Sequence, residues 1–212
     1  MNKTLSKTIT VITMCAMLAG CASVKAATKH NKKHHKAKTT VEQTQSTTST
    51  STTAQQNTSS GNISYYFPRD NGQPDKRLID IINNSKSSLD IAIYSITKKD
   101  IVDSIISAKK RGLIVRLITD GKESESKSEA KELSLLKNAG IPIKVNTHTG
   151  LMHLKVTIAD SKIVTTGSYN YTNDASFKND EVLVVLNDVT VAKQFETEFT
   201  RMWNDNSNFK EY

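Results

Sequence analysis

The residues with the clearest chemical potential lie past the middle of the chain, at His153 and Lys155. An imidazole is a competent nucleophile in covalent catalysis, and a lysine ammonium binds phosphate as a point charge. Leu154 to Ala159 reads as a strand, in which residues two apart point to the same face. We therefore expect the two side chains to lie next to each other, with Leu154 between them turned into the core.

A second group of polar residues follows one predicted hairpin later. Gly167 allows a close approach of the backbone, and Ser168 and Asn170 share a face and can donate hydrogen bonds to phosphate oxygens. Glu181 stands at the start of the next predicted strand. A carboxylate there that accepts a hydrogen bond from imidazole Nδ1 would leave Nε2 free to attack. Together these are the parts that a phosphoryl transfer needs, namely an in-line nucleophile and electrostatic stabilisation of the equatorial oxygens.

Taken one at a time, these residues have ordinary structural explanations. A histidine near a strand end is most often a surface side chain, and a lone strand lysine such as Lys155 is most often solvated. Gly167-Ser168 with Asn170 is the composition of a turn, and Asp160 alone is a turn residue between two predicted strands. The chemical hypothesis therefore rests on the joint pattern.

Neither a metal nor another cofactor is predicted. The two cysteines, Cys15 and Cys21, both precede residue 22, so a thiolate zinc site and a disulfide framework are excluded for the rest of the chain. His148 and His153 are the two histidines after residue 60, and the carboxylates show no clustering typical of a two-metal site. The sequence therefore favours catalysis by side chains alone.

The elements that must position these residues read as an α/β domain. Strands are expected at 63–67, 89–96, 113–119, 141–145, 154–159, 163–166 and 181–186, and helices at 74–84, 100–111, 126–138 and 189–203. The order up to residue 145 is β-α-β-α-β-α-β, which is typical of layered α/β folds. The sequence predicts one domain with a mixed, largely parallel β-sheet sandwiched between helices.

The first sixty residues are predicted to be a targeting signal followed by a linker. Residues 1–20 combine lysines with an apolar stretch of about 11 residues, which is too short to span a bilayer and is typical of a signal peptide. Leu18 to Cys21 resembles a bacterial lipobox, in which Cys21 becomes the lipidated N-terminus; cleavage after Ala26 is the alternative. Residues 21–60 are basic and then rich in Thr, Ser and Gln, so a disordered linker is expected before a catalytic domain at 61–212.

This organisation predicts an exported protein. Lipidation at Cys21 would anchor it to the membrane, on the outer side of the cell, whereas the alternative cleavage would leave it secreted or periplasmic.

The charge does not assign the substrate by itself. The chain has 29 basic and 21 acidic side chains, of which residues 1–60 hold eight basic and one acidic. Residues 61–212 therefore hold 21 basic and 20 acidic side chains. Nonspecific nucleic-acid binding rests on Lys and Arg contacts to phosphates, so a nearly neutral domain would need a local basic rim. Lys98, Lys99 and the run 109–111 are candidates. The basic tail is either a solvated spacer or a second contact for polyanions.

The joint spacing resembles the HKD motif of the phospholipase D superfamily, with the motif residues His153, Lys155, Asp160, Gly167, Ser168 and Asn170. Residues 62–205 as a whole resemble the superfamily's domain, in its short, single-motif bacterial endonuclease branch. The resemblance implies that His153 forms a phosphohistidine, that Lys155 and Asn170 grip the phosphate, and that Ser168 lines the pocket. It implies that Glu181 orients His153 and gives Asp160 a more structural part.

The resemblance also implies a homodimer. Two imidazoles serve each reaction, one to attack and one to protonate the leaving oxygen, and family members place two motifs around one site. This chain has one motif and no internal repeat. We therefore expect His153 of each chain to face its counterpart across a twofold axis. His148 is the alternative acid.

Three functions remain in contention at this point. The leading one is a metal-independent phosphodiesterase on nucleic acid. It would be a nonspecific endonuclease that acts on DNA, with RNA as the alternative substrate. The second is a phospholipase D-type hydrolase or transferase on phospholipid, against which stand the single motif and the lack of an obvious apolar loop for acyl chains. The third is a non-catalytic binding lipoprotein that keeps the fold.

Overall fold

The computed structural model describes residues 59–212, so the predicted signal peptide, the lipidation site at Cys21 and all but the last two residues of the predicted linker lie outside the described residues. The strands are β1 Ser59–Ser60, β2 Ile63–Tyr66, β3 Ser88–Ile93, β4 Ile114–Thr119, β5 Ile143–Asn146, β6 Lys155–Ala159, β7 Ile163–Gly167, β8 Leu183–Asn187 and β9 Phe209–Glu211. The helices are α1 Pro74–Asn84, α2 Lys99–Lys110, α3 Lys127–Asn138, α4 Asn173–Phe177 and α5 Val189–Asn204, with 3-10 turns η1 Pro68–Asp70 and η2 Glu123–Glu125.

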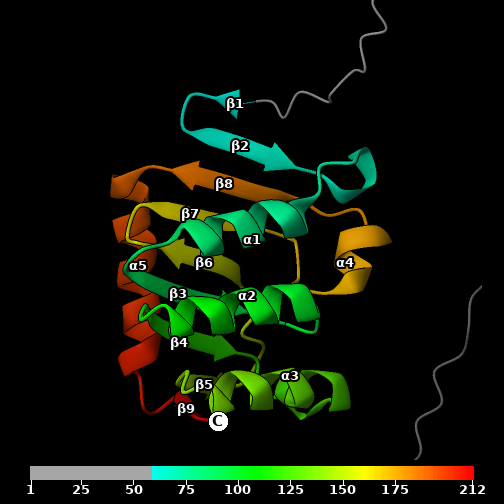
Figure 1. The fold of residues 1–212 in the computed structure, drawn as a ribbon. Helices are drawn as coiled ribbons and strands as arrows, with labels where there is room; N and C mark the ends of the chain where they lie inside the picture. The colour runs from blue at the N-terminus through cyan, green and yellow to red at the C-terminus, as the bar shows by residue number, and fades with distance from the viewer. Residues whose placement is uncertain (1–58) are drawn as a thin grey trace, which may run out of the picture. The chain divides into compact units, whose positions relative to one another are not determined.

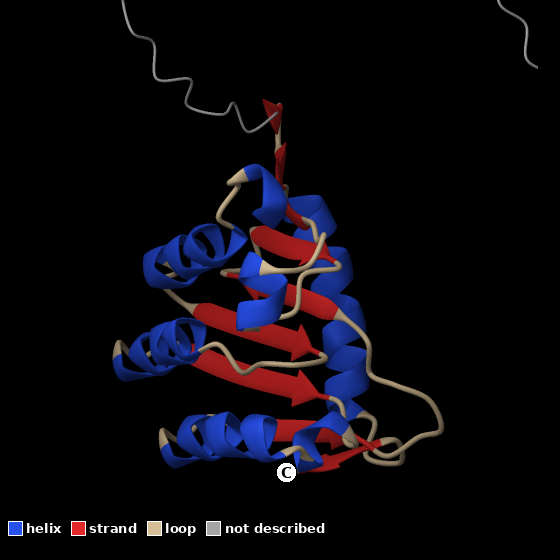
Figure 2. Cartoon of the chain, turned by 90° about the vertical axis from the view of Figure 1, so that its right-hand side faces the viewer, coloured by secondary structure: helices blue, strands red, loops and turns tan. Residues whose placement is uncertain are grey.

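All described strands form one sheet in the order β1-β2-β8-β7-β6-β3-β4-β5-β9, and helices cover both of its faces (Figures 1 and 2). Helices α1, α2 and α3 lie side by side on one face, and α5 crosses the other. Leu78, Ile105 and Leu133 belong to the core under the three helices, and Phe199 and Met202 to the core under α5. The predicted sandwich of a mixed sheet between helices is confirmed.

Parallel pairing is confined to β3, β4 and β5, and the other pairs are antiparallel. The sheet is therefore mixed but less parallel than the sequence indicated. The physical reason lies in the connections between strands. Helices α2 and α3 carry the chain back to the end of the sheet where the previous strand began, so the next strand runs parallel, whereas β6, β7 and β8 follow one another without such a crossover.

The predicted helices agree with the observed ones to within a residue at each end, but some strands differ in length. The strand expected at 89–96 ends at Ile93, because the residues after Tyr94 turn away to contact α3 and the loop after β7. Strand β6 begins at Lys155 rather than Leu154. The prediction that Leu154 turns into the core is wrong, since its side chain is 40% exposed and faces the hollow beside α5.

Asp160 occupies the turn between β6 and β7 and fixes it to the start of β3. Asp160 and Ser161 have φ of 54° and 53°, the left-handed conformation that a tight type I′ turn requires at both central residues. The Asp160 carboxylate accepts hydrogen bonds from the backbone N–H groups of Lys86, Ser87 and Ser88 and from the Ser87 hydroxyl. Its role in this chain is structural.

Asp160 therefore lies apart from the other motif residues, in keeping with the more structural part that the resemblance implies for it. It follows the last residue of β6, whereas Lys155 is the first, and a five-residue strand separates its ends by roughly 13 Å or more. A carboxylate at that distance does not reach a phosphate held by Lys155.

Replacing Asp160 with alanine is expected to lower the free energy of unfolding by about 2–3 kcal/mol, because several donors lose a charged acceptor together. Urea denaturation checks this. Burial alone would raise the pKa of Asp160, but the hydrogen bonds from Ser87, Ser88 and Lys86 outweigh it and hold the pKa below its usual value. The stabilisation is therefore present at neutral pH and is lost as pH falls through the lowered pKa. Asp160→Asn should lack this acid limb; an unchanged unfolding free energy in Asp160→Ala would contradict the assignment.

Candidate active site

Strand register brings the predicted polar residues to one edge of the sheet, which is formed by the last residues of β3 and β7 and the first residues of β6 and β8. This edge is on the right in Figure 1. Ile93, the last residue of β3, pairs with Lys155, the first residue of β6. Gly167, the last residue of β7, pairs with Leu183, the first residue of β8. Since β6 lies between β3 and β7, the residues next to these ends must meet, although nearly ninety residues of sequence separate the first from the last.

His153 and Lys155 share one neighbour, Tyr94, which directly follows β3. The Tyr94 and His153 ring centroids are 4.6 Å apart, and Lys155 Nζ lies 4.9 Å from the Tyr94 centroid. Lys155 Nζ also donates a hydrogen bond of 2.9 Å to the His153 carbonyl oxygen. The predicted proximity of His153 and Lys155 is thus observed, although His153 precedes the strand. The His153 side chain is exposed, whereas the Lys155 side chain is buried.

Sequence reasoning gave Tyr94 no role. The available signal was its place at the end of an apolar strand, which a strand tyrosine shares with many structural residues. Burial raises the pKa of Tyr94, and the nearby charges of Glu123 and Asp120 raise it further, so its hydroxyl stays protonated at neutral pH. Tyr94 acts here as a neutral partner that fixes the positions of both motif side chains.

The Lys155 ammonium has a lowered pKa. Its desolvation is the main cause, and the charge of Glu181 partly offsets it. The ammonium has three N–H donors, and the structure gives it one hydrogen-bond acceptor, the His153 carbonyl oxygen. Its other N–H groups are therefore available for a ligand. It is therefore suited to accept an anionic ligand at this edge.

Ser168 and Glu181 meet on the far side of the cluster, at the ends of β7 and β8. Ser168 Oγ donates to Glu181 Oε2 at 2.5 Å and accepts from the Val182 N–H, while Asn179 Nδ2 donates to Glu181 Oε1 at 3.1 Å. Gly167 makes this approach possible: its φ is 125°, and a Cβ there would lie 2.2 Å from the Val182 carbonyl oxygen. The Glu181 carboxylate is thus fixed by hydrogen bonds on both oxygens.

Asn170 lies in the loop after β7, and its side-chain oxygen is buried without a hydrogen-bond partner among the described residues. A buried polar atom in that state costs free energy unless a ligand or water satisfies it. Its position follows the strand end that carries Ser168, so it faces the same edge of the sheet as the other motif residues. The hydrogen bond from His153 to Glu181 that would orient the imidazole stays a prediction.

A buried carboxylate on α3 holds this edge in place. Glu129 accepts hydrogen bonds from the Ile96 N–H at 2.8 Å and from Ser95 Oγ at 3.0 Å, directly after Tyr94. The same segment pairs with the loop after Asn170, because the Tyr171 N–H donates to the Ser95 carbonyl oxygen at 3.0 Å. Glu129 therefore braces the segment that carries Tyr94 and supports the Asn170 loop.

Glu129 makes stability depend on pH. Burial raises its pKa to about 7 despite the hydrogen bonds from Ile96 and Ser95, and among residues 59–212 no lysine or arginine forms an ion pair with it. The folded state therefore binds a proton more tightly than the unfolded chain, and stability falls as pH rises from about 4.5 to about 7. Glu129→Gln keeps the shape without the charge, and we expect it to raise stability at pH 8 by up to about 3 kcal/mol, at 1.36 kcal/mol per pKa unit, with little change at pH 4.

Urea denaturation at both pH values measures this effect. The exposed Glu125→Gln is the matched control and is expected to leave the free energy of unfolding unchanged. A stability difference for Glu129→Gln that is equal at the two pH values would show that the effect comes from packing rather than from charge.

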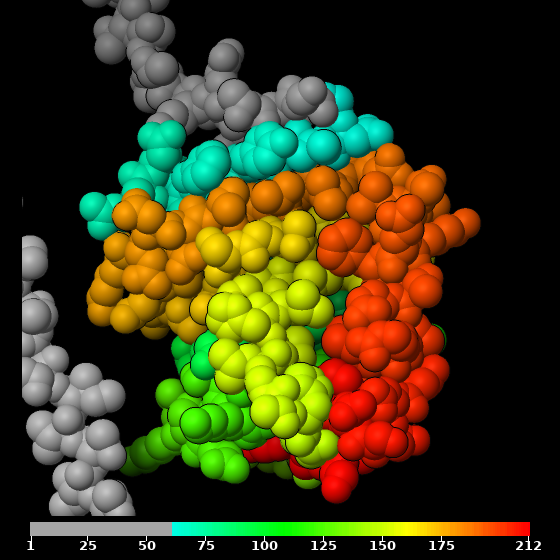
Figure 3. All heavy atoms as spheres, turned by 180° about the vertical axis from the view of Figure 1, so that it is seen from behind, coloured from blue at the N-terminus to red at the C-terminus, as the bar shows by residue number. Residues whose placement is uncertain are grey.

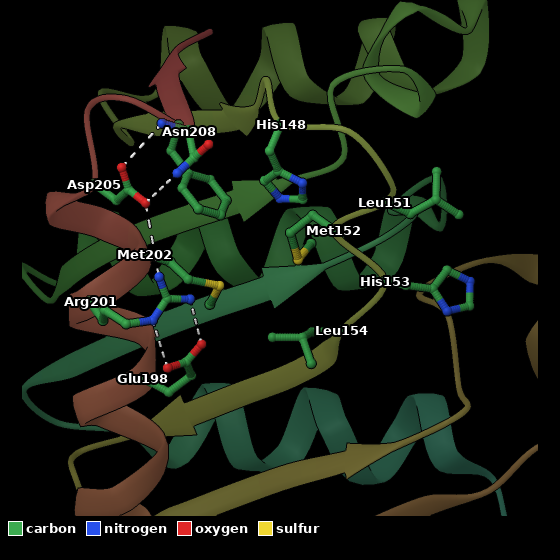
Figure 4. Close-up of a pocket in the computed structure, with 11 residues that line it drawn as sticks. His148, Leu151, Met152, His153, Leu154, Glu198, Arg201, Met202, Asp205 and Asn208 are labelled. Carbon is green, nitrogen blue, oxygen red and sulfur yellow. Dashed lines mark hydrogen bonds and ion pairs between the residues drawn. The ribbon is translucent and has the colours of Figure 1, made fainter.

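An open hollow of about 520 Å³ separates the segment 148–154 from α5 and is lined by both domain histidines (Figure 4). The two rings point in different directions there. His148 Nδ1 is 3.0 Å from the Thr149 carbonyl oxygen, and its ring packs edge-on against Phe209, whereas His153 packs on Tyr94. His148 therefore does not join the cluster around Lys155.

The basic rim expected from the sequence is not formed by the residues proposed for it. Lys98 is buried, with Nζ 3.4 Å from Asp75, and Lys99 pairs with Asp103. The run 109–111 lies at the C-terminal end of α2, at the opposite edge of the sheet, because a crossover helix carries the chain back to where the strands begin. Arg69, beyond β2, is instead a cation near the motif residues, since it lines a hollow together with Ser168 and Glu181.

The described part of the chain holds neither a cluster of metal-binding side chains nor a membrane-spanning helix. Between residues 59 and 212, no three His, Cys, Asp or Glu side chains are grouped so that they could hold a metal ion. Within the same range, none of the helices combines the length and the apolar character needed to cross a bilayer.

The chain is similar to curated relatives over its domain. It is 28% identical over 128 residues to the mitochondrial cardiolipin hydrolase of Chlamydomonas reinhardtii, a match that covers 60% of this chain and 56% of the relative. It is 32% identical over 147 residues to the protein of the same name from Drosophila melanogaster, covering 60% and 57%. The chain thus spans less than two thirds of the length of these relatives.

Solved structures give the same picture. Nuc from Salmonella typhimurium, described as a phospholipase D family member, superposes with a TM-score of 0.66 at 28% identity, covering 71% of this chain and 97% of that one. NucT from Helicobacter pylori superposes with a TM-score of 0.60 at 29% identity, covering 66% and 94%.

A family model described as "Cardiolipin synthase, PLD-like domain" matches residues 78–203, which include the candidate site and more than half of the chain. The fold is a mixed sheet between helices with the motif residues at one edge, and it is the fold of a phospholipase D family member. On these grounds the chain belongs to the phospholipase D superfamily, through its PLD-like domain.

Proposed function

We propose that this protein is a metal-independent phosphodiesterase that cleaves nucleic acid, as a nonspecific DNA endonuclease. The observation that carries the proposal is the pair of an exposed imidazole, His153, and a buried ammonium, Lys155, around Tyr94. The buried side-chain oxygen of Asn170, which lacks a hydrogen-bond partner among the described residues, lies in the loop after β7 at the same edge of the sheet. The cluster lies at the edge of the sheet formed by the ends of β3, β6, β7 and β8, the side that is turned towards the viewer in Figure 2. A phosphodiester that continues in both directions can pass along such an edge.

In the proposed reaction, His153 Nε2 attacks the phosphorus and forms a P–N bond while the P–O bond to the leaving oxygen breaks. Lys155 and Asn170 stabilise the charge that develops on the equatorial oxygens. A proton from a second imidazole neutralises the leaving oxygen. Water then attacks the phosphohistidine, transfers a proton to that same imidazole and releases the phosphate end, which restores both histidines.

The second imidazole is proposed to be His153 of the partner subunit in a homodimer. What supports this is the position of His148, the other histidine of residues 61–212, which packs on Phe209 and is turned away from the cluster. The exposed side chains of Leu151 and Leu154 border the candidate site and would be covered by a second copy. Export and anchoring through Cys21 are proposed from the sequence.

Plasmid DNA cleavage by the full-length protein in excess EDTA tests the proposal. Cutting that persists in EDTA, by a protein that sediments as a dimer, is the expected result. Cutting that requires added Mg²⁺ or Mn²⁺ would contradict the phosphohistidine route. No cutting of DNA or RNA by a folded dimer would remove the nucleic-acid assignment.

Phospholipid is the second candidate substrate, and one observation favours it. An apolar hollow of about 220 Å³ lies between Leu154 and α5, lined also by Val156, Phe195 and Phe199, on the face seen in Figure 3. It adjoins the larger hollow that includes His153, so it could receive part of an acyl chain. The relatives named as cardiolipin hydrolases agree with this alternative. Release of phosphatidic acid from cardiolipin vesicles, in the absence of DNA cleavage, would establish it.

A further inference from the structure

A third hollow adjoins the candidate active site on its other side, towards β2. It has a volume of about 460 Å³, and its walls include Phe67 and Arg69, the acidic Asp180, and two residues of the site itself, Ser168 and Glu181. Because Ser168 and Glu181 belong to both, the hollow borders the proposed phosphate-binding site. A substrate held at Lys155 would therefore extend into it.

Phe67 presents an unoccupied aromatic ring to this hollow. Its side chain is 46% exposed, and within residues 59–212 the ring makes no aromatic or cation–π contact. Phe177, which is also exposed, differs because Lys98 Nζ lies 4.7 Å from its ring centroid and occupies one face. Of the two exposed phenylalanines at this edge, Phe67 thus has the free faces.

The backbone around Phe67 is rigid. The N–H groups of Asp70 and Gly72 both donate to the Phe67 carbonyl oxygen, at 3.2 and 2.9 Å. The turn is so close that a Cβ on Gly72 would lie 2.6 Å from the Phe67 nitrogen. Arg69 Nη1 then donates to the Lys178 carbonyl oxygen and ties η1 to the end of α4. A ring held this way loses little entropy when a ligand packs on it.

The charges of the hollow select against phosphate. The Asp180 side chain is almost fully exposed, and the Glu181 carboxylate lies at the boundary with the active site. The one guanidinium present, that of Arg69, is already shared with Lys178 and lies 3.8 Å from Asp180. An uncharged planar group fits these walls better than a phosphate. A nucleobase is such a group, and it is linked to the backbone next to the scissile phosphate.

We propose that Phe67 is a stacking platform for an unpaired nucleobase that flanks the cleaved phosphate. The inference rests on the proposed function, since it takes nucleic acid as the substrate. The phosphate binds at Lys155 while the neighbouring base lies on the Phe67 ring. A paired base is stacked inside its duplex and cannot reach the ring, so the platform favours single-stranded substrate or bases that have opened out.

The test compares two substrates with the same backbone charge: an oligothymidylate and an equally long chain of abasic tetrahydrofuran units. The full-length wild-type protein is expected to cleave both and to prefer the base-bearing strand in kcat/KM by about 5- to 100-fold, the range for one stacked base. Phe67→Ala is expected to remove most of this preference through KM. Phe67→Trp should retain it, and Phe67→Leu, which is apolar without an aromatic face, should not.

Ile114→Ala is the matched control, because Ile114 is exposed at the far edge of the sheet, at the start of β4. It should leave the preference unchanged. Equal cleavage of the two strands by the wild type, or an undiminished preference in a folded Phe67→Leu protein, would overturn the platform and leave the proposed function standing. Cleavage of neither strand by a wild-type protein that cuts plasmid DNA would overturn the platform alone, whereas failure to cut plasmid DNA as well would overturn both.

Discussion

Replacing His153 with alanine is expected to lower the rate of phosphodiester cleavage by at least about 10⁴-fold, because loss of a nucleophile removes the covalent route altogether. The fold should survive, since the His153 side chain is exposed and its described contact is one ring packing against Tyr94. The measurement is initial cleavage rate in EDTA, with unfolding by urea as a check that the protein remains native.

His148→Ala is the matched control for this experiment. It removes the same kind of side chain from the same hollow, but one that packs on Phe209 rather than on Tyr94. We expect near wild-type cleavage from it. A loss of activity in His148→Ala equal to that in His153→Ala would make His148 the proton donor and would remove the reason for a second subunit in the site. Wild-type protein that is denatured with SDS at alkaline pH during turnover should also carry a covalently bound phosphate that is released by acid and is missing from His153→Ala.

Replacing Lys155 with methionine is expected to lower kcat/KM by about 10²- to 10³-fold, the effect of removing one charge that stabilises the transition state. Methionine has a similar volume, so the buried position stays filled, and the stability of the fold should hold or rise. Lys162→Met is the matched control, since Lys162 is an exposed lysine at the opposite end of β6. It should retain full activity.

The pH dependence gives an independent check on Lys155. Desolvation lowers the pKa of its ammonium, and only the charged form stabilises a phosphate anion. Cleavage should therefore decline as pH rises through this lowered pKa, and the alkaline limb should begin below the usual lysine value of 10.5. Lys155→Met should show a low rate without that limb. An alkaline limb that persists in the variant would assign the titration to another group.

Local sequence patterns were sufficient for the four long helices and for the motif, but not for the short helix α4 at Asn173–Phe177. The apolar spacing of Leu78, Ile81 and Ile82 predicts α1 to the residue, because one buried face of a helix repeats every three to four positions. The spacing of the motif residues predicted that His153 and Lys155 lie close together, and it identified the superfamily to which the chain belongs. The reason is that strand alternation and turn residues encode which side chains share a face.

Long-range pairing decided what the sequence alone could not. Tyr94 meets His153, and Glu129 meets Ser95, because β3 and α3 are packed by a core assembled from distant segments. Leu154 follows the strand alternation in sequence, but β6 begins one residue later, so its side chain faces outwards beside α5. The two motif carboxylates also have different partners for this reason. Asp160 accepts hydrogen bonds from backbone N–H groups at the start of β3, whereas Glu181 accepts one from Ser168 at the candidate site. A pattern of residue types determines faces and periods, whereas the partner that each polar atom finds depends on the tertiary structure.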